Sequence, residues 1–188
     1  MARKVKVRRV VDGDSLVVNY GGLFSCLRRP FPVRLYGIDA PELAQPYGPE
    51  ARKELASLVR RGAVRMDVIA TDRYGRTVGL IYAGRRRRES VNVAMVRAGM
   101  AYWYRRYGGR NLGFPEAEAE AKTKRRGVWR DGRRARRPWD YRADQRRARQ
   151  RRGRLRRFFI RLAVAGLVLI ALVILLLIAR TLGYGANG

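Results

Sequence analysis

The chain has 188 residues, with 43 Lys and Arg against 15 Asp and Glu, and its formal net charge is +28. Such a charge favours polyanionic partners, either nucleic acid or an anionic membrane surface, and argues against an enzyme of small neutral metabolites. The chain has no histidine and one cysteine, which excludes a Ser-His-Asp triad, a His-ligated zinc site and an internal disulfide. Hydrophobic residues make up 47% of it, which is enough for a folded core.

Valine-rich segments with loose alternation predict five strands in the first half of the chain. They cover residues 3–11, 15–20, 31–38, 63–72 and 77–84. The sequence Asp12-Gly13-Asp14 between the first two is typical of a tight turn. Pro41 ends the third strand because proline cannot join a strand ladder.

Three helices are expected from their capping residues and their apolar faces. Gly48-Pro49-Glu50 opens the first, with proline in the first turn, and Gly62 ends it. Ser90 caps the second, which runs through Met100. The third begins at Pro115, with acidic residues early and basic residues late, as the helix dipole favours.

The helices follow strands without alternating regularly with them, which favours an α+β fold with an antiparallel sheet. A five-stranded, partly open barrel of the OB type would close such a sheet. The charge then divides the chain, since residues 122–161 alone carry 19 Lys and Arg and 3 Asp. We expect a globular domain, an arginine-rich connector, an apolar helix and a short tail, at residues 1–129, 130–157, 158–180 and 181–188.

The apolar segment predicts a membrane span. Leu162–Ala179 has 18 residues without a charged or polar side chain. As a helix this segment is about 27 Å long, at about 1.5 Å per residue, close to the roughly 30 Å of a bilayer core. A buried core helix is the alternative, but such a helix would normally carry some polar residue.

The arginines around this segment predict its orientation. They crowd the residues before it, whereas only Arg180 follows it, so the positive-inside rule places the amino-terminal domain in the cytoplasm. We therefore expect a single-pass C-terminal anchor, with translocation of the domain as the alternative. The sequence does not decide whether the connector is helix or coil. Its arginines would bind anionic membrane lipids, at about 1 kcal/mol each near the surface, or would help to hold DNA.

Acidic and arginine residues gather at the ends of the expected strands. Asp14 begins one strand and Asp39 ends another, and Glu42 follows Asp39 across a proline. Two carboxylates can hold a hard cation such as calcium, and a third can orient or deprotonate a water. Arg34 and Arg76 supply planar forks that match phosphate oxygens. Together these residue types suit the hydrolysis of a phosphodiester.

The motifs also resemble those of a known family. VVDGDSLVV (10–18), VRLYGIDAPEL (33–43), TDRYGRTVGLIY (71–82), SVNVAMVRAGMAYWY (90–104) and AEAKTKRRGVW (119–129) are similar to the staphylococcal nuclease (thermonuclease-like) family, over about residues 7–129. The spacing of Arg34, Asp39 and Glu42 is specific to that family. The resemblance implies an OB-type barrel with helices.

The resemblance also implies a metal site and a base. Asp14, Asp39 and the backbone carbonyl of Ala40 would bind Ca²⁺, and alanine keeps the carbonyl where the family often has threonine. Glu42 would activate or position the attacking water.

The same resemblance assigns substrate contacts. Arg34 and Arg76 would bind the scissile phosphate and its transition state, and Arg73 and Tyr74 would contact a terminal phosphate. Tyr107 aligns with one of two base-flanking aromatic residues, whereas the other is an arginine here. The base contacts therefore match the family less well than the hydrolytic residues do.

The resemblance thus implies a calcium-dependent nuclease that hydrolyses DNA or RNA and leaves 3′-phosphate ends. A non-catalytic OB-type module that binds nucleic acid at the membrane is the alternative. The clustered carboxylates argue against it, because they would repel phosphate and serve no purpose in a pure binder. Metal-dependent cleavage that a chelator blocks would distinguish the two.

Overall fold

The computed structural model describes residues 2–21, 29–60, 63–84, 89–106, 112–130, 132 and 136–184. It contains two compact units, Met1–Asp140 and Tyr141–Gly188, and each is described here by itself.

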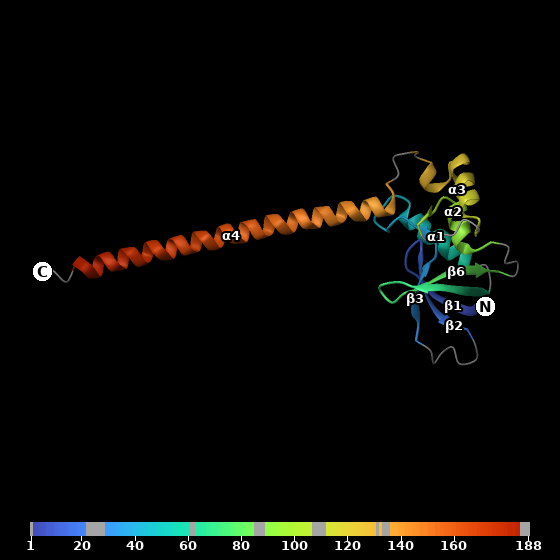
Figure 1. The fold of residues 1–188 in the computed structure, drawn as a ribbon, viewed down its shortest axis with the longest axis horizontal. Coiled ribbons are helices and arrows are strands. Elements are labelled where there is room, and N and C mark those ends of the chain that lie inside the picture. Colours follow the sequence, from blue (N-terminus) through green and yellow to red (C-terminus); the bar gives the residue numbers. More distant parts are fainter. Residues whose placement is uncertain are drawn as a thin grey trace. The chain divides into compact units, whose positions relative to one another are not determined.

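Five strands of the first unit form a closed barrel (Figure 1). In barrel order they are β1 (Arg3–Val10), β2 (Ser15–Tyr20), β3 (Phe31–Leu35), β6 (Thr77–Ala83) and β5 (Val64–Thr71). The predicted five-stranded OB-type barrel is confirmed. Four neighbouring pairs are antiparallel, but β3 and β6 run parallel, so the expectation of a wholly antiparallel sheet is wrong. The reason is geometric, because an odd number of strands cannot alternate in direction around a closed ring.

A second, two-stranded sheet lies beyond the end of β3. The third strand was expected to run to Ile38 but ends at Leu35, because Gly37 adopts a left-handed backbone (φ 74°) that turns the chain out of the barrel. The chain then forms β4 (Ile38–Asp39), which pairs antiparallel with β7 (Tyr102–Trp103). Asp39 lies opposite Tyr102 in this pair.

Three α-helices gather on one side of the barrel (Figure 1). They are α1 (Gly48–Arg60), α2 (Val91–Arg97) and α3 (Phe114–Thr123), and a short 3₁₀ turn, η3 (Gly127–Trp129), follows α3. Each of the three predicted helices is present, and Ser90 caps α2 by accepting a 3.2 Å hydrogen bond from the Val93 N–H. Helix α2 ends at Arg97 and not at Met100 as expected, because the left-handed backbone of Gly99 (φ 68°) turns the chain away. The expected stop of α1 at Gly62 lies outside the described residues. Helix α1 buries its apolar face, formed by Ala51, Leu55, Leu58 and Val59, in the core.

The buried amide of Asn92 joins α2 to the parallel strand pair. Its Oδ1 accepts a hydrogen bond from the Ile81 N–H at 3.0 Å. Its Nδ2 donates to the carbonyl oxygens of Tyr36, at 2.9 Å, and of Gly79, at 3.1 Å. Asn92 has no exposed surface, so water cannot replace these bonds if the amide is removed.

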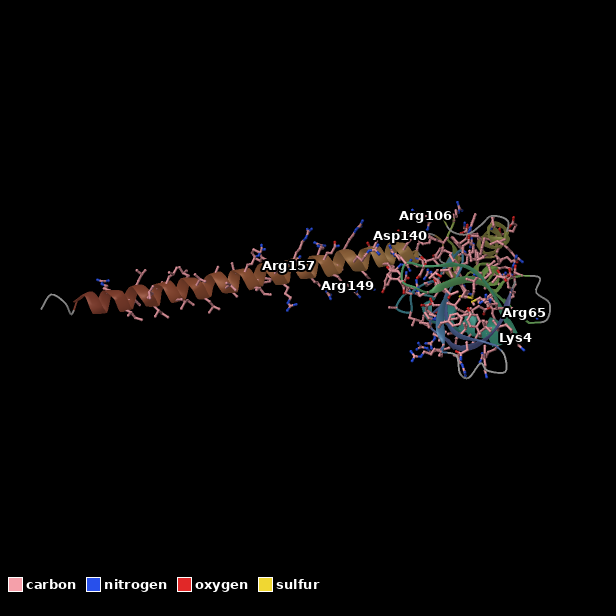
Figure 2. All side chains as sticks on the ribbon, turned by 60° about the horizontal axis from the view of Figure 1, so that its bottom comes forward. Lys4, Arg65, Arg106, Asp140, Arg149 and Arg157 are labelled. Carbon is pink, nitrogen blue, oxygen red and sulfur yellow. The ribbon has the colours of Figure 1, made fainter. Side chains whose placement is uncertain are left out.

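Helix α4 (Pro138–Tyr184) has 47 residues and begins in the first unit. The sequence did not decide between helix and coil for the connector, and the structure shows that it is helical from Pro138 on. Figure 2 shows basic side chains such as Arg149 and Arg157 standing out from the first part of α4. Among the described residues, this helix alone is long and apolar enough to cross a membrane, judged by length and composition.

We predict that Asn92→Ala lowers the free energy of unfolding by about 3 kcal/mol or more, because several buried polar groups lose their partner and each costs about 1–3 kcal/mol. Denaturant unfolding of the full chain measures the change. Ser90→Ala, which removes only a helix cap, is the control and should cost about 1 kcal/mol. Equal losses in the two variants would contradict the role given to Asn92.

Candidate active site

The centre of the site is one arginine between two buried aspartates. Register places Arg34 of β3 opposite Ser15 at the start of β2, directly beside Asp14. Arg34 Nη2 lies 3.0 Å from Asp14 Oδ2 and 2.8 Å from Asp39 Oδ1. Arg34 Nη1 also donates to Asp14 Oδ1 at 3.2 Å. The guanidinium therefore bridges one carboxylate from the turn before β2 and one from β4.

Short hydrogen bonds and close backbone packing fix the position of Asp14. Ser15 Oγ donates to Asp14 Oδ1 at 2.8 Å, and the Ala40 N–H donates to Asp14 Oδ2 at 3.2 Å. Gly13 makes this approach possible, because a Cβ there would lie 2.6 Å from the Cβ of Ala40 and 2.7 Å from that of Ala51. The turn is thus pressed against both the Ala40 segment and α1.

The cluster buries more negative than positive charge. The side chain of Asp14 is 5% exposed and that of Asp39 is 2% exposed, whereas that of Arg34 is 25% exposed. Burial raises the pKa of Asp14 to about 7, with Arg34 acting in the opposite direction and Asp12 and Asp39 adding to the rise. A single guanidinium therefore does not balance the surrounding carboxylates, so either a proton on Asp14 or a further cation would compensate their charge.

The donor atoms around this cluster are few and all oxygen. In the part of the chain that the structure describes, no group of three or more His, Cys, Asp and Glu side chains converges as a metal site. Asp14 and Asp39 supply two carboxylates, and the carbonyl of Ala40 is adjacent in the chain. Hard cations such as calcium accept carboxylate, carbonyl and water oxygens together, so this donor set fits such an ion with water completing the shell.

Glu42 lies two residues beyond Ala40, in a loop that its neighbour Gln45 holds. The Glu42 N–H donates to Gln45 Oε1 at 2.8 Å, and the Gln45 N–H donates to the Glu42 carbonyl at 2.8 Å. Gly48 approaches the same carbonyl so closely that a Cβ there would lie 2.0 Å from it. Sequence reasoning did not single out Gln45, since a glutamine in a loop has no distinctive pattern.

Arg76 lies in a turn organised by Asp72. Asp72 Oδ1 accepts hydrogen bonds from the N–H groups of Tyr74, at 2.9 Å, and Arg76, at 3.0 Å. Asp72 Oδ2 accepts one from Arg76 Nε at 2.7 Å. Burial alone would raise the pKa of Asp72, but these hydrogen bonds outweigh it and leave the pKa lowered. Asp72 was also missed from the sequence, where it reads as an ordinary turn residue.

Some of the expected site residues are in direct contact, and others are connected to them by paired strands. Asp14, Arg34, Asp39 and Ala40 are in direct contact. The Arg76 turn leads into β6, which pairs with β3 so that Val78 lies opposite Arg34. Tyr107 lies outside the described residues.

Arg73 and Tyr74 form an exposed pair in the same turn as Arg76. The Arg73 guanidinium lies 5.0 Å from the centre of the Tyr74 ring, and the Arg76 guanidinium lies 5.6 Å from it. Tyr74 is 70% exposed. A cationic and aromatic surface of this kind suits a phosphate with an attached base.

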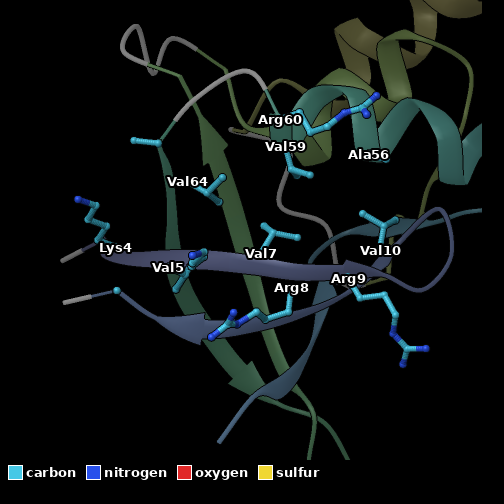
Figure 3. A pocket seen from close by; sticks show the side chains of 13 residues that line it. Lys4, Val5, Val7, Arg8, Arg9, Val10, Ala56, Val59, Arg60 and Val64 are labelled. Atoms are coloured by element: carbon cyan, nitrogen blue, oxygen red, sulfur yellow. The ribbon is translucent and has the colours of Figure 1, made fainter. Parts of the chain in front are cut away.

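A cavity elsewhere in the first unit is not this site. It has a volume of about 570 Å³ and lies between β1 and α1, with apolar side chains such as Val7 and Val59 around it and basic ones such as Arg9 and Arg60 (Figure 3). Its described lining contains neither a carboxylate nor any residue of the expected catalytic set. It therefore offers no metal ligands.

The fold and the site together define a class of protein. An OB-type barrel carries, at the ends of its strands, two buried carboxylates bridged by an arginine, a glutamate loop and a second arginine turn. Carboxylates and arginine forks are the residue types that suit a phosphodiesterase.

Comparison with known proteins identifies the family. Residues 32–131 match the family described as Staphylococcal nuclease homologue. The chain is 39% identical to a micrococcal nuclease of Shigella flexneri over 144 residues, 73% of this chain and 79% of that protein. It is 40% identical to a probable staphylococcal-like nuclease of Oryza sativa subsp. japonica over 120 residues, 64% of this chain and 30% of that protein. The chain therefore belongs to the staphylococcal nuclease homologue family, as its motifs indicated.

We predict that Asp72→Asn destabilises the protein at neutral pH and has no effect at strongly acidic pH. A lowered folded-state pKa means that the carboxylate contributes stability above its unfolded value of 3.8, and that this contribution is lost as the pH falls through the lower folded value. Melting temperatures of parent and variant across the acidic range measure this. A difference that stays constant down to the lowest pH would contradict the prediction.

Proposed function

We propose that the chain is a metal-dependent nuclease, with Ca²⁺ as its metal, that hydrolyses DNA or RNA and leaves 3′-phosphate ends. The observation that carries this proposal is the buried bridge of Arg34 between Asp14 and Asp39. Membership of a family with named nucleases supports the same conclusion.

In this proposal, Asp14, Asp39 and the Ala40 carbonyl would hold the ion. When bound, the ion supplies positive charge that polarises a phosphate oxygen and acidifies a coordinated water. The burial of both aspartates supports this assignment, because buried carboxylates need a compensating cation.

The remaining chemistry belongs to side chains of the chain itself. Glu42 accepts a proton from the water that attacks phosphorus, and the bond from phosphorus to the 5′ oxygen, in line with the attack, breaks. The 5′ oxygen leaves as a hydroxyl after taking a proton from solvent water. Arg34 and Arg76 bind the non-bridging oxygens, whose negative charge grows in the transition state. To bind the phosphate, Arg76 gives up its ion pair with Asp72. Arg34 can keep its ion pair with Asp39 while its other N–H groups bind the phosphate.

Substrate binding in this proposal uses the exposed turn before β6. Arg73 and Tyr74 contact a second phosphate there, and Tyr107 flanks the base. The net charge of +28 raises the local concentration of nucleic acid and makes binding dependent on salt.

The alternative of a non-catalytic binding module is disfavoured by the same cluster. Asp14 and Asp39 contribute negative charge where a phosphate would have to approach, which costs a binder affinity. A nuclease offsets that cost with a metal ion. The test therefore measures cleavage and not binding alone.

We predict that Glu42→Gln lowers turnover of a labelled single-stranded oligonucleotide by about 10²-fold or more, as expected when a proton acceptor is removed. Arg34→Lys should lower it to a similar extent, because lysine keeps the charge but loses the fork. Glu50→Gln is the matched control and should keep the parent rate, since Glu50 is exposed on α1.

The same assay tests the metal. Cleavage should require added calcium and stop with a calcium chelator, and the products should carry 3′-phosphates. Parent-level cleavage by Glu42→Gln would overturn the assigned base. Binding of the oligonucleotide without any cleavage in calcium or magnesium would favour the non-catalytic module.

We further propose that α4 anchors the protein in a membrane, with the nuclease domain on the cytoplasmic side. The apolar side chains from Leu162 to Ile178 are exposed, from 48% at Val173 to 69% at Leu176, so no protein core covers them in the described structure. An exposed apolar surface of this length calls for lipid. The arginines that precede it would contact anionic headgroups.

We predict that the full chain sediments with membranes and is released by detergent but not by alkaline carbonate. A variant with Leu169→Arg and Val173→Arg should become extractable, because each charge at the bilayer centre costs about 3 kcal/mol. Gly153→Arg is the control, as it adds charge outside the apolar segment. If alkaline carbonate extracts the parent chain, the anchor is contradicted. In sealed inverted vesicles the cytoplasmic face points outward, so added protease should digest the domain, and protection of the domain would contradict its orientation.

A further inference from the structure

The last residues of the first unit pack against the loop that carries Glu42 and against Tyr102 of β7, the strand that pairs with Asp39. These residues, Arg136 to Trp139, follow the predicted domain and include the first turn of α4. They contact the Glu42 loop through a hydrogen bond of Gln45, and Trp139 contacts the rings of Tyr102 and Tyr104.

The polar contact goes through the side chain of Gln45. Its Oε1 accepts the hydrogen bond from the Glu42 N–H, and its Nε2 donates to the Arg136 carbonyl at 3.2 Å. Gln45 is 4% exposed, so this amide is shielded from water. A single side chain thus joins the backbone of the proposed base to the residue two positions before α4.

The aromatic contacts reach the Asp39 side of the site. The centre of the Trp139 ring lies 5.8 Å from that of Tyr102 and 5.7 Å from that of Tyr104. Tyr102 lies opposite Asp39 in the β4–β7 pair, and the Tyr104 N–H donates to the Gly37 carbonyl at 2.9 Å. Packing of Trp139 therefore supports the short sheet that carries one carboxylate of the cluster.

A two-residue strand such as β4 cannot hold its place alone, since it has few ladder bonds. Aromatic pairs contribute about 0.5–1.5 kcal/mol each beyond buried area, so the contacts of Trp139, together with the contact of Tyr102 with Trp129 at 5.2 Å, add to what holds this sheet. In the Glu42 loop, the side-chain amide of Gln45 accepts the hydrogen bond that holds the Glu42 N–H.

We propose that Gln45 and Trp139 are positioning residues, which hold the Glu42 loop and the Asp39 strand in their catalytic geometry by fastening residues 136–139 to the domain. This inference rests on the proposed nuclease function. It makes the start of α4 part of the catalytic unit, so that turnover depends on a segment that precedes the proposed anchor. Displacement of a reacting group by about 1 Å can cost up to about 10²-fold in rate, so the support need not touch substrate.

The test uses the full chain in detergent micelles, with Gln45→Ala, Trp139→Ala, Trp139→Phe and Glu42→Gln. We expect Gln45→Ala and Trp139→Ala each to lower kcat about tenfold while KM changes less than about twofold, since neither residue binds substrate. Trp139→Phe should restore most of the rate because an aromatic ring remains. Gln150→Ala is the matched control, a glutamine exposed on α4, and should keep the parent rate.

Hydrogen exchange provides a readout that does not depend on catalysis. Amide exchange of residues 42–48 should become faster in Gln45→Ala and in Trp139→Ala, whereas exchange in β5 should stay at the parent rate. Glu42→Gln should be inactive but exchange normally in this loop, because its N–H still bonds to Gln45. Faster exchange throughout the barrel would mean general destabilisation and would overturn the proposal.

The outcomes separate this inference from the proposed function. If Glu42→Gln cleaves at the parent rate, the assigned base is wrong, whereas the exchange result still decides whether residues 136–139 hold the loop. If Glu42→Gln is slow but Trp139→Ala keeps parent kcat and parent exchange, the positioning role is wrong and the nuclease assignment stands. A rise in KM with unchanged kcat would also overturn it, since it would indicate a substrate contact.

Discussion

The structure of the site depends on the burial of two carboxylates around one guanidinium. Isolated buried charges are costly, and Arg34 offsets only part of that cost for Asp14 and Asp39. The barrel therefore has to supply this arginine from β3, which is paired on both sides, and hold both aspartates at fixed positions. Its strand ends, the Gly13 turn and the β4–β7 sheet all serve this requirement, which a loop-built site could not meet as rigidly.

Local sequence patterns predicted most of the fold and the central residues. Valine-rich segments and capping residues located the five barrel strands and the three helices because these signals act over a few residues. The motifs around Asp14, Arg34 and Asp39 indicated a common site, and the structure shows these three in contact. The parts assigned to Glu42 and Arg76 in catalysis remain proposals, although their loops now have defined supports.

The features that could not be predicted arise from contacts between distant segments. The parallel β3–β6 pair follows from barrel closure with five strands, which no local pattern encodes. Gln45 accepts a local hydrogen bond from the Glu42 N–H, but its side chain also joins this loop to Arg136, which is 91 positions away in the chain. Long-range pairing of this kind needs either a structure or relatives to reveal it.

The parallel pairing of β3 and β6 determines where inserted residues would alter the site. Arg34 and Val78 are partners in adjacent strands, and Arg76 lies two residues before Val78. The distance between Arg34 and Arg76 along the barrel is therefore set by the number of residues from Arg76 to Val78. The chain between Leu35 and Val64 does not enter that count, although it carries Asp39, the Glu42 loop and the buried face of α1. A single inserted residue between Arg76 and Val78 would shift the second guanidinium by about 3.3 Å and turn it to the opposite face of the sheet.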